Sequence, residues 1–434
     1  MWTYDAKRIR FIGRIFVLVS IMTWFYRQDL MSLNYIILLN FIVKFIIHLI
    51  AKTSLFTKKE SDVSIVSFKR KAKIFSLLIS VFMAVILLSA TAFLTMSDQV
   101  GGDLGEYDSP HYYDGKFNNL EDASVSTGSF FGTLMDYMVG NSDRSPGETV
   151  PTQPYKQAEV EENDVRVTWF GHSTILIETH DTTLLFDPVF GSDNLNPLVF
   201  GPAPFDYEHT YQLSQLPEID YVFISHDHYD HLDMKAIKFF RESDTRFLVP
   251  LGVASHLEHW GIRRDRVIEF DWWQTRDIAG ISFTCTPAQH FSGRTATIAM
   301  QKTLWSSWAL RTEATSVYFS GDSGYAGHFK EIGDRLGPFD LTFIDAGQYN
   351  ERWRQVHNLP PEVIDAFNDL NGNILVPIGW GMFTLALHDW FEPPVEISSR
   401  ALEIGAIAVI PRFGEWVDIK QKLPDEKWWE PLIE

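Results

Sequence analysis

The feature that most constrains this chain is the seven-residue segment Ser225–His231, which reads Ser-His-Asp-His-Tyr-Asp-His. Residues 219–224 before it are apolar and rich in strand formers, and residues 232–240 after it carry apolar side chains at helical spacing. The segment is therefore expected to form the loop between a strand and a helix. Three imidazoles and a carboxylate this close together are typical ligands of borderline divalent metals such as zinc. The alternative is a surface loop that is merely rich in histidine and aspartate, which leaves the regular spacing unexplained.

Polar residues also follow other strand-like runs. Short strand-like and helical stretches alternate from about Val165 to the C-terminus, which predicts a layered α/β domain. His290, Asp322 and Asp345 each come at or just after the end of a strand-like run. Ligand sites in α/β folds lie at such strand ends. We therefore expect His290 and Asp322 to join the histidine cluster, although each by itself would pass for a structural or turn residue.

The first 96 residues differ from the rest in charge and hydropathy. They contain 13 Lys+Arg and 4 Asp+Glu, a net charge of +9, so residues 97–434 carry −28 in a chain of net charge −19. Ile74 to Met96 is an apolar run without a charge, and about 20 such residues span a bilayer as a helix. Leu30 to Ile50 and Phe11 to Tyr26 are further candidate spans. Residues 1–96 are thus expected to be a membrane anchor with two or three transmembrane helices.

Charge placement predicts the topology of this anchor. Basic residues lie before the first apolar run and again between residues 52 and 73, and positively charged flanks stay in the cytoplasm. The first two runs then form a hairpin, and the third exports the remainder of the chain. We expect an integral protein of the inner or plasma membrane, with a polar linker over residues 97–163 and an extracytoplasmic main domain over residues 164–434. The acidic excess of that domain argues against a nucleic-acid partner, and the single cysteine, Cys285, excludes an intrachain disulfide.

Five segments, in chain order, resemble the metallo-β-lactamase superfamily: Gly171-His172-Ser173-Thr174, Asp187-Pro188, His226–His231, Pro287–Arg294 and Gly321–Gly324. They are most similar to the branch that includes the N-acyl-phosphatidylethanolamine-hydrolysing phospholipase D and the L-ascorbate-6-phosphate lactonase. The resemblance runs from about Val165 to the C-terminus, and residues 111–119 are also similar to a segment found upstream in bacterial members. It implies that residues 164–434 are a hydrolase domain of the α/β class, folded as an αββα sandwich with a metal cleft at one edge.

The resemblance also implies a set of metal ligands. Carried over by position, they are His226, His228 and His290 for a first ion, Asp230 and His231 for a second, and Asp322 between the two. The family has one more histidine in a Pro-x-His-Trp-Gly-x-Phe stretch, where this chain has Gly379. His388 could reach in from the following loop, water could fill the place, or the site could work with one ion. The implied cofactor is zinc, one or two ions per chain, with manganese or iron as alternatives.

Other residues near these motifs are candidates for further roles. Arg294 could hold a phosphate oxygen as a bidentate donor, or it could be an ordinary ion-paired arginine. His357 resembles a family position near the cleft and could protonate the leaving group. Asp187 is expected to orient a ligand histidine. His172 is a candidate substrate-binding residue that lines the cleft.

The chemistry that such a site supports is hydrolysis. A divalent cation lowers the pKa of bound water toward ~7 and stabilises negative oxygens, with Asp230 and Asp322 as catalytic carboxylates. A membrane anchor favours a phosphodiesterase that acts on N-acylphosphatidylethanolamine-type phospholipids, with the bilayer and its lipids as partners. A lactonase or other ester hydrolase of the same fold is the alternative enzyme, and a non-catalytic sensor that lost a ligand at Gly379 is a third possibility. Four tryptophans could contact acyl chains or belong to the core: Trp272, Trp273, Trp305 and Trp308.

Overall fold

The structure is a computed structural model. It describes residues 98–102, 104–123, 136, 140, 142–157, 159–162, 164–190, 204–294, 300–420 and 423–433. Within these ranges no helix has both the length and the apolar character needed to cross a bilayer. The predicted membrane segments, all within residues 1–96, lie outside the described residues.

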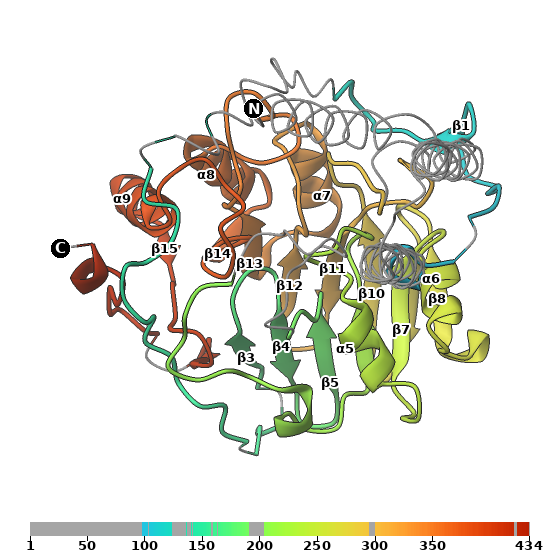
Figure 1. The fold of residues 1–434 in the computed structure, drawn as a ribbon, viewed down its shortest axis with the longest axis horizontal. Helices are drawn as coiled ribbons and strands as arrows, with labels where there is room; N and C mark the ends of the chain where they lie inside the picture. The colour runs from blue at the N-terminus through green and yellow to red at the C-terminus, as the bar shows by residue number, and fades with distance from the viewer. Residues whose placement is uncertain are drawn as a thin grey trace, which may run out of the picture. The chain divides into compact units, whose positions relative to one another are not determined.

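Two seven-stranded sheets form the centre of the described domain (Figure 1). The first has the order β16-β3-β4-β5-β6-β7-β8 and the second β15-β14-β13-β12-β11-β10-β9. The strands of the first sheet are β3 (Arg166–Trp169), β4 (Ile175–Glu178), β5 (Thr183–Phe186), β6 (Tyr221–Phe223), β7 (Arg246–Pro250), β8 (Val267–Phe270) and β16 (Trp416–Asp418). Those of the second are β9 (Thr275–Ile278), β10 (Ile281–Thr286), β11 (Ser307–Arg311), β12 (Ser316–Phe319), β13 (Phe339–Asp345), β14 (Gly372–Ile378) and β15 (Ile407–Ala408).

Helices cover the two sheets from outside. They are α5 (Met234–Phe239), α6 (Ala254–His259), α7 (His328–Leu336), α8 (Pro360–Asp369) and α9 (Glu392–Ile404), with short 3-10 turns at Leu213–Gln215, Arg264–Arg266 and Glu430–Leu432. Buried side chains of α7, α8 and α9 form one cluster with residues of β11 to β14. Phe240, at the end of α5, packs on Phe247 of β7. The predicted layered α/β domain is therefore confirmed.

The helix ends follow from the local sequence. The Asp233 carboxylate accepts a hydrogen bond from the Lys235 amide and so caps the start of α5. Prolines stand in the first turn of α8, where their missing amide hydrogen has no partner to lose. α9 ends at Gly405, whose φ of 72° is the left-handed conformation that glycine adopts without strain.

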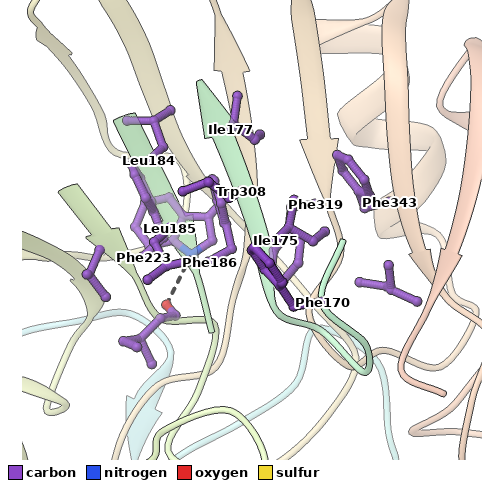
Figure 2. Packing of buried hydrophobic residues seen from close by; sticks show 14 of the residues in the cluster. Phe170, Ile175, Ile177, Leu184, Leu185, Phe186, Phe223, Trp308, Phe319 and Phe343 are labelled. Carbon is purple, nitrogen blue, oxygen red and sulfur yellow. Dashed lines mark hydrogen bonds between the residues drawn. The ribbon is translucent and has the colours of Figure 1, made fainter. Parts of the chain in front are cut away.

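Aromatic side chains fill the space between the two sheets (Figure 2). Phe186 and Phe223 of the first sheet stack with their ring centroids 4.6 Å apart. Phe319 lies 5.0 Å from Phe186, and Trp308 lies 5.3 Å from Phe223, so β12 and β11 meet β5 and β6 here. The indole of Trp308 also donates to the Ile224 carbonyl, at 3.1 Å. This contact anchors the strand that leads directly into the histidine segment.

The tryptophans considered as acyl-chain contacts belong largely to the core. Trp272, Trp305 and Trp308 are buried, and Trp273 is partly buried beneath the guanidinium of Arg335. The indole of Trp272 donates to the Trp305 carbonyl at 2.7 Å. The core interpretation of these residues therefore holds in place of the lipid-contact one.

The described parts of the predicted linker pack on the domain. Strands β1 (Tyr112–Tyr113) and β2 (Lys116–Phe117) form a small hairpin, and Phe117 is fully buried. Asn119 donates from Nδ2 to the His290 carbonyl at 2.8 Å and accepts from the His290 amide at 3.1 Å. These segments of 97–163 are thus part of the domain rather than a free tether.

Candidate metal centre

The predicted ligands meet because of how the strands run. β5 and β6 are parallel, and so are β12, β13 and β14, while β10 joins β12 through two antiparallel pairings and therefore runs the same way. The loops that follow β6, β10, β12 and β13 consequently leave the sheets at one edge. These loops carry the histidine segment, His290, Asp322 and the residues after Asp345.

Three histidine nitrogens converge at the first group. Nε2 of His226 lies 2.8 Å from Nδ1 of His228, and Nε2 of His290 lies 3.2 Å from the same atom. All three ligand atoms lie within 4.8 Å of one another. Three imidazoles around one point are a donor set that suits zinc and similar divalent ions.

A second group stands beside the first. Oδ2 of Asp230 lies 3.2 Å from Nε2 of His172 and 3.8 Å from Nε2 of His231. Asp322 stands between the groups, with Oδ1 3.1 Å from Nε2 of His231 and Oδ2 3.8 Å from Nε2 of His290. This arrangement suits a carboxylate shared by two neighbouring cations.

Two buried atoms test whether a cation fits. Nε2 of His231 and Oδ1 of Asp322 are buried and have no hydrogen-bond partner, although they lie only 3.1 Å apart. Buried polar atoms normally have a partner. Here the two atoms are close but not aligned with each other, and a divalent ion on their common side would satisfy both. The residues present therefore fit a metal ion.

Other side chains hold the ligand imidazoles in place. Asp187 is fully buried, and its Oδ2 lies 2.7 Å from Nδ1 of His231 while its Oδ1 accepts from the Ser225 amide at 2.7 Å. Nδ1 of His290 lies 2.9 Å from the Val356 carbonyl, which leaves Nε2 facing the group. Asp187 thus lies where the predicted orienting carboxylate should be.

Burial and charge tune these groups for metal binding. Burial lowers the pKa of His226, His228 and His290, so their imidazoles are neutral, which is the form that binds a cation. Burial alone would raise the pKa of Asp230 and Asp322, but the neighbouring histidines, His231 foremost, together outweigh burial and lower both. Burial opposes a charged His231, yet Asp322 and Asp230 raise its pKa, so a proton competes with a cation for Nε2.

His357 lies next to the centre with one nitrogen already engaged. Its Nδ1 is 2.9 Å from Oδ2 of Asp345, and its Nε2 is 4.0 Å from Oδ2 of Asp322. Burial lowers the pKa of His357, but the carboxylates of Asp345, Asp322 and Asp230 together outweigh burial and raise it. A protonated Nε2 beside the ligands is placed as a proton donor requires.

His388 does not join the described ligand groups. Its Nδ1 lies 2.8 Å from the Asp389 carbonyl, and its ring stacks on Tyr349 with centroids 4.1 Å apart. None of the ligand groups formed by the described residues includes it. Of the alternatives considered for the Gly379 position, ligation by His388 finds no support among the described residues, because its own loop and Tyr349 hold the ring.

Arg294 does not act as the predicted phosphate donor. It is buried, its Nη1 donates to the carbonyls of Asp227 and Leu232 at 2.8 and 2.9 Å, and its guanidinium lies 4.0 Å from the Tyr229 ring centroid. Its Nε donates to the Gln99 carbonyl at 3.0 Å. These contacts make Arg294 a positioning residue for the loop that carries the histidines.

Sequence reasoning missed two residues at the centre. Gln348 has a left-handed backbone, with φ of 57°, and its amide Nε2 donates to Oδ2 of Asp230 at 3.0 Å. It stands three residues after Asp345, so the strand-end rule was a signal that could have found it. Asn119, which holds the His290 backbone, belongs to the segment 111–119, whose similarity to bacterial family members was the signal that could have found it.

Comparisons with known proteins agree with this site. The family profile described as "Beta-lactamase superfamily domain" matches residues 182–380. An uncharacterized protein of Mycobacterium tuberculosis is 37% identical over 333 residues, which cover 74% of this chain and 87% of that protein. The N-acyl-phosphatidylethanolamine-hydrolyzing phospholipase D 1 of Caenorhabditis elegans is 32% identical over 250 residues, 54% of this chain and 68% of that enzyme. A metallo hydrolase structure from the archaeon Ignicoccus hospitalis aligns with a TM-score of 0.46 at 20% identity, and covers 60% of this chain and 100% of that one.

The matched part of the chain is the part that carries the centre. The profile match begins just before β5 and ends at Trp380, so it includes the histidine segment, His290 and Asp322. Divalent metals bind at this edge of the fold, where the His and Asp groups of this chain gather. The chain therefore belongs to the metallo-β-lactamase superfamily, as a metal-dependent hydrolase of the branch that includes N-acyl-phosphatidylethanolamine-hydrolysing phospholipases D.

Proposed function

We propose that this protein is a membrane-anchored phosphodiesterase that cleaves phospholipid-like substrates of the N-acylphosphatidylethanolamine type. The observation that carries the proposal is an apolar cavity of about 310 Å³ beside the metal centre. It is lined by Phe170, Val189, Phe190, Pro204, Phe205, Asp206, Tyr207, Thr210, Tyr211 and Met382. Such a lining suits a hydrocarbon chain.

Two residues that line the cavity are close in sequence to residues at the second ligand group. Phe170 stands two residues before His172, and Met382 is followed by Phe383, whose ring lies 5.9 Å from the His172 ring. A substrate with an apolar tail in the cavity would thus have its polar head near His172 and Asp230. The similarity to the phospholipase D of Caenorhabditis elegans supports the same substrate class.

The reaction is the hydrolysis of a phosphodiester. When bound, divalent cations at such a centre lower the pKa of water and stabilise negative oxygens. The oxygen of water forms a bond to phosphorus, the bond from phosphorus to the alcohol oxygen breaks, and that oxygen needs a proton. His357 donates this proton from Nε2, while Asp345 holds its Nδ1 at 2.9 Å and keeps the ring in position.

The anchor and the location are part of the proposal. The apolar runs within residues 1–96 and their basic flanks support an anchor in the inner or plasma membrane with the domain on the extracytoplasmic side. Asp98, which follows these runs, is bonded to the domain, because the indole of Trp260 donates to the Asp98 carbonyl at 2.6 Å. Attachment this close to α6 would keep the centre near lipid substrates.

The test is lipid hydrolysis by the purified full-length chain. Detergent-solubilised protein, loaded with zinc or stripped by a chelator, is mixed with N-acylphosphatidylethanolamine, and the products are measured by mass spectrometry. We expect zinc-dependent release of phosphatidic acid and N-acylethanolamine, and none from His226→Ala. Turnover of esters or lactones without phosphatidic acid release would replace the proposal by the ester-hydrolase alternative. A metal-loaded protein inert on all of these substrates would favour the sensor alternative.

A further inference from the structure

Gly379 stands where the Pro-x-His-Trp-Gly-x-Phe stretch of the family has a histidine, and its surroundings leave no room for a side chain. Gly379 follows β14 and has a φ of 81°, which side chains rarely adopt. A Cβ there would lie 2.6 Å from Oδ1 of Asp345. That carboxylate holds His357 through its other oxygen, at 2.9 Å. A side chain at residue 379 would therefore disturb the pair formed by Asp345 and His357.

The backbone of Gly379 runs directly beside His172. The Gly379 amide donates to the His172 carbonyl at 3.0 Å, and the His172 amide donates to the Trp380 carbonyl at 2.9 Å. The indole of Trp169 donates to the same His172 carbonyl at 2.9 Å. These bonds hold His172 at a φ of 48°, a left-handed conformation that non-glycine residues seldom adopt and that gathers at functional sites.

The His172 side chain points into the second ligand group. The residue is 1% exposed, and its Nε2 lies 3.2 Å from Oδ2 of Asp230. Its ring centroid lies 5.0 Å from that of His231. His172, Asp230 and His231 each offer a ligand atom, and these three atoms lie within 4.8 Å of one another.

We propose that His172 supplies, through Nε2, the imidazole that residue 379 cannot supply. The second divalent cation is then held by His172, Asp230 and His231, while Asp322 contacts the group through His231. Bonds of 2.0–2.1 Å in a tetrahedral site separate neighbouring ligand atoms by about 3.3 Å. The separations among the three ligands are 3.2 Å between His172 and Asp230 and 3.8 Å between Asp230 and His231.

Gln348 acts as a positioning residue in this arrangement. Its Nε2 donates to Oδ2 of Asp230 at 3.0 Å and lies 3.4 Å from Nε2 of His172. It therefore fixes the Asp230 carboxylate against the His172 ring. The inference rests on the metal-dependent function proposed above, but it concerns the number of ions held and not the substrate.

The test is the metal content of the full-length protein in detergent. Chelator-stripped protein is titrated with zinc, and the ions bound per chain are counted by mass spectrometry of the metal; the cobalt(II) form is followed by its absorption spectrum. We expect two ions per chain in the wild type and one in both His172→Ala and His172→Asn. Asparagine tolerates a left-handed backbone, so His172→Asn separates the loss of the ligand from a loss of folding.

Matched controls separate the outcomes. His388→Ala removes a buried histidine outside the described ligand groups and is expected to keep both ions. A wild type that binds a single ion, or a folded His172→Asn that binds two as tightly as the wild type, would overturn the inference. Two ions in a protein that is inert on N-acylphosphatidylethanolamine would leave it standing and remove only the phosphodiesterase proposal.

Discussion

At the scale of single residues, the contact between Asp345 and His357 affects the pKa of the His357 imidazole. Oδ2 of Asp345 lies 2.9 Å from Nδ1 of His357, and both residues are buried. Burial lowers the pKa of His357, whereas the charge and hydrogen bond of Asp345, together with the charges of Asp322 and Asp230, raise it and prevail. Nδ1 of His357 faces Asp345, while its Nε2 lies 4.0 Å from Oδ2 of Asp322.

The first prediction concerns this pair. Asp345→Asn removes the charge that raises the pKa of His357, so that pKa falls. Since the donor must be protonated, activity is lost as pH rises through this pKa, and the alkaline limb of the kcat profile moves to lower pH. General acids contribute about 100-fold or more to the rate. At pH values above the shifted alkaline limb, kcat should therefore fall about 100-fold. A profile with an unmoved alkaline limb would contradict the assignment; Asp365→Asn, which removes an exposed acid on α8, is the control.

The second prediction separates the two roles considered for Arg294. Arg294→Ala leaves the buried carbonyls of Asp227 and Leu232 without their donor, at about 1–3 kcal/mol each. We expect a loss of roughly 2–5 kcal/mol in the free energy of unfolding, measured by chemical denaturation, whereas exposed Arg276→Ala should change little. A raised KM with unchanged stability would restore the phosphate-binding role.

At the scale of elements, the loop after β2 braces the loop after β10. Asn119 exchanges two hydrogen bonds with the His290 backbone, and its side-chain oxygen also accepts from the Trp305 indole at 2.9 Å. A segment some 170 positions away in the sequence therefore fixes a ligand of the first group. This explains why the described residues before β3 belong to the catalytic domain.

The third prediction follows from this brace. Asn119→Ala should weaken zinc binding about 10–100-fold, as the loss of groups that orient metal ligands commonly does. Competition with a chromogenic chelator measures the affinity. Asn118→Ala is the matched control, because the Asn118 side chain donates to the nearby carbonyls of Tyr113 and Lys116 within the same hairpin. Equal zinc affinity in the two variants would show that Asn119 serves the hairpin alone.

At the scale of the whole molecule, the chain divides into a basic apolar front and an acidic remainder. Residues 1–96 have a net charge of +9, and the domain described by the structure follows from Asp98. Lys238 of α5 and the indole of Trp260 both contact Asp98, at 2.5 and 2.6 Å. The domain is thus tied to the chain immediately after the predicted third span.

The fourth prediction concerns the orientation of this arrangement. A reporter enzyme that folds only outside the cytoplasm, fused after Met96, should be active, because the basic flanks keep both ends of the first hairpin inside. The same reporter fused after Lys59 should be inactive. The reverse pattern would turn the domain to the cytoplasm and contradict the proposed location.

The sequence by itself determined the class of the fold and most of the centre. Ser225–His231, His290 and Asp322 carry metal-binding side chains at strand ends, and parallel strands bring such ends to one edge whatever the details of packing. The strand-like runs that form β5, β6 and β12 are also predicted from the sequence, and Phe186, Phe223 and Phe319 within them are buried.

Only the tertiary structure shows where the side chains of His172, His388 and Arg294 lie. The neighbours that hold these residues are distant in sequence. The Trp380 carbonyl accepts a hydrogen bond from the His172 amide, the Tyr349 ring stacks on His388, and the Asp227 and Leu232 carbonyls accept from Arg294. Hydrogen bonds and ring contacts act over a few ångströms, so they select partners only after the chain has folded. The sequence therefore shows which residues can act as metal ligands, whereas packing in the folded chain sets the direction in which each side chain points.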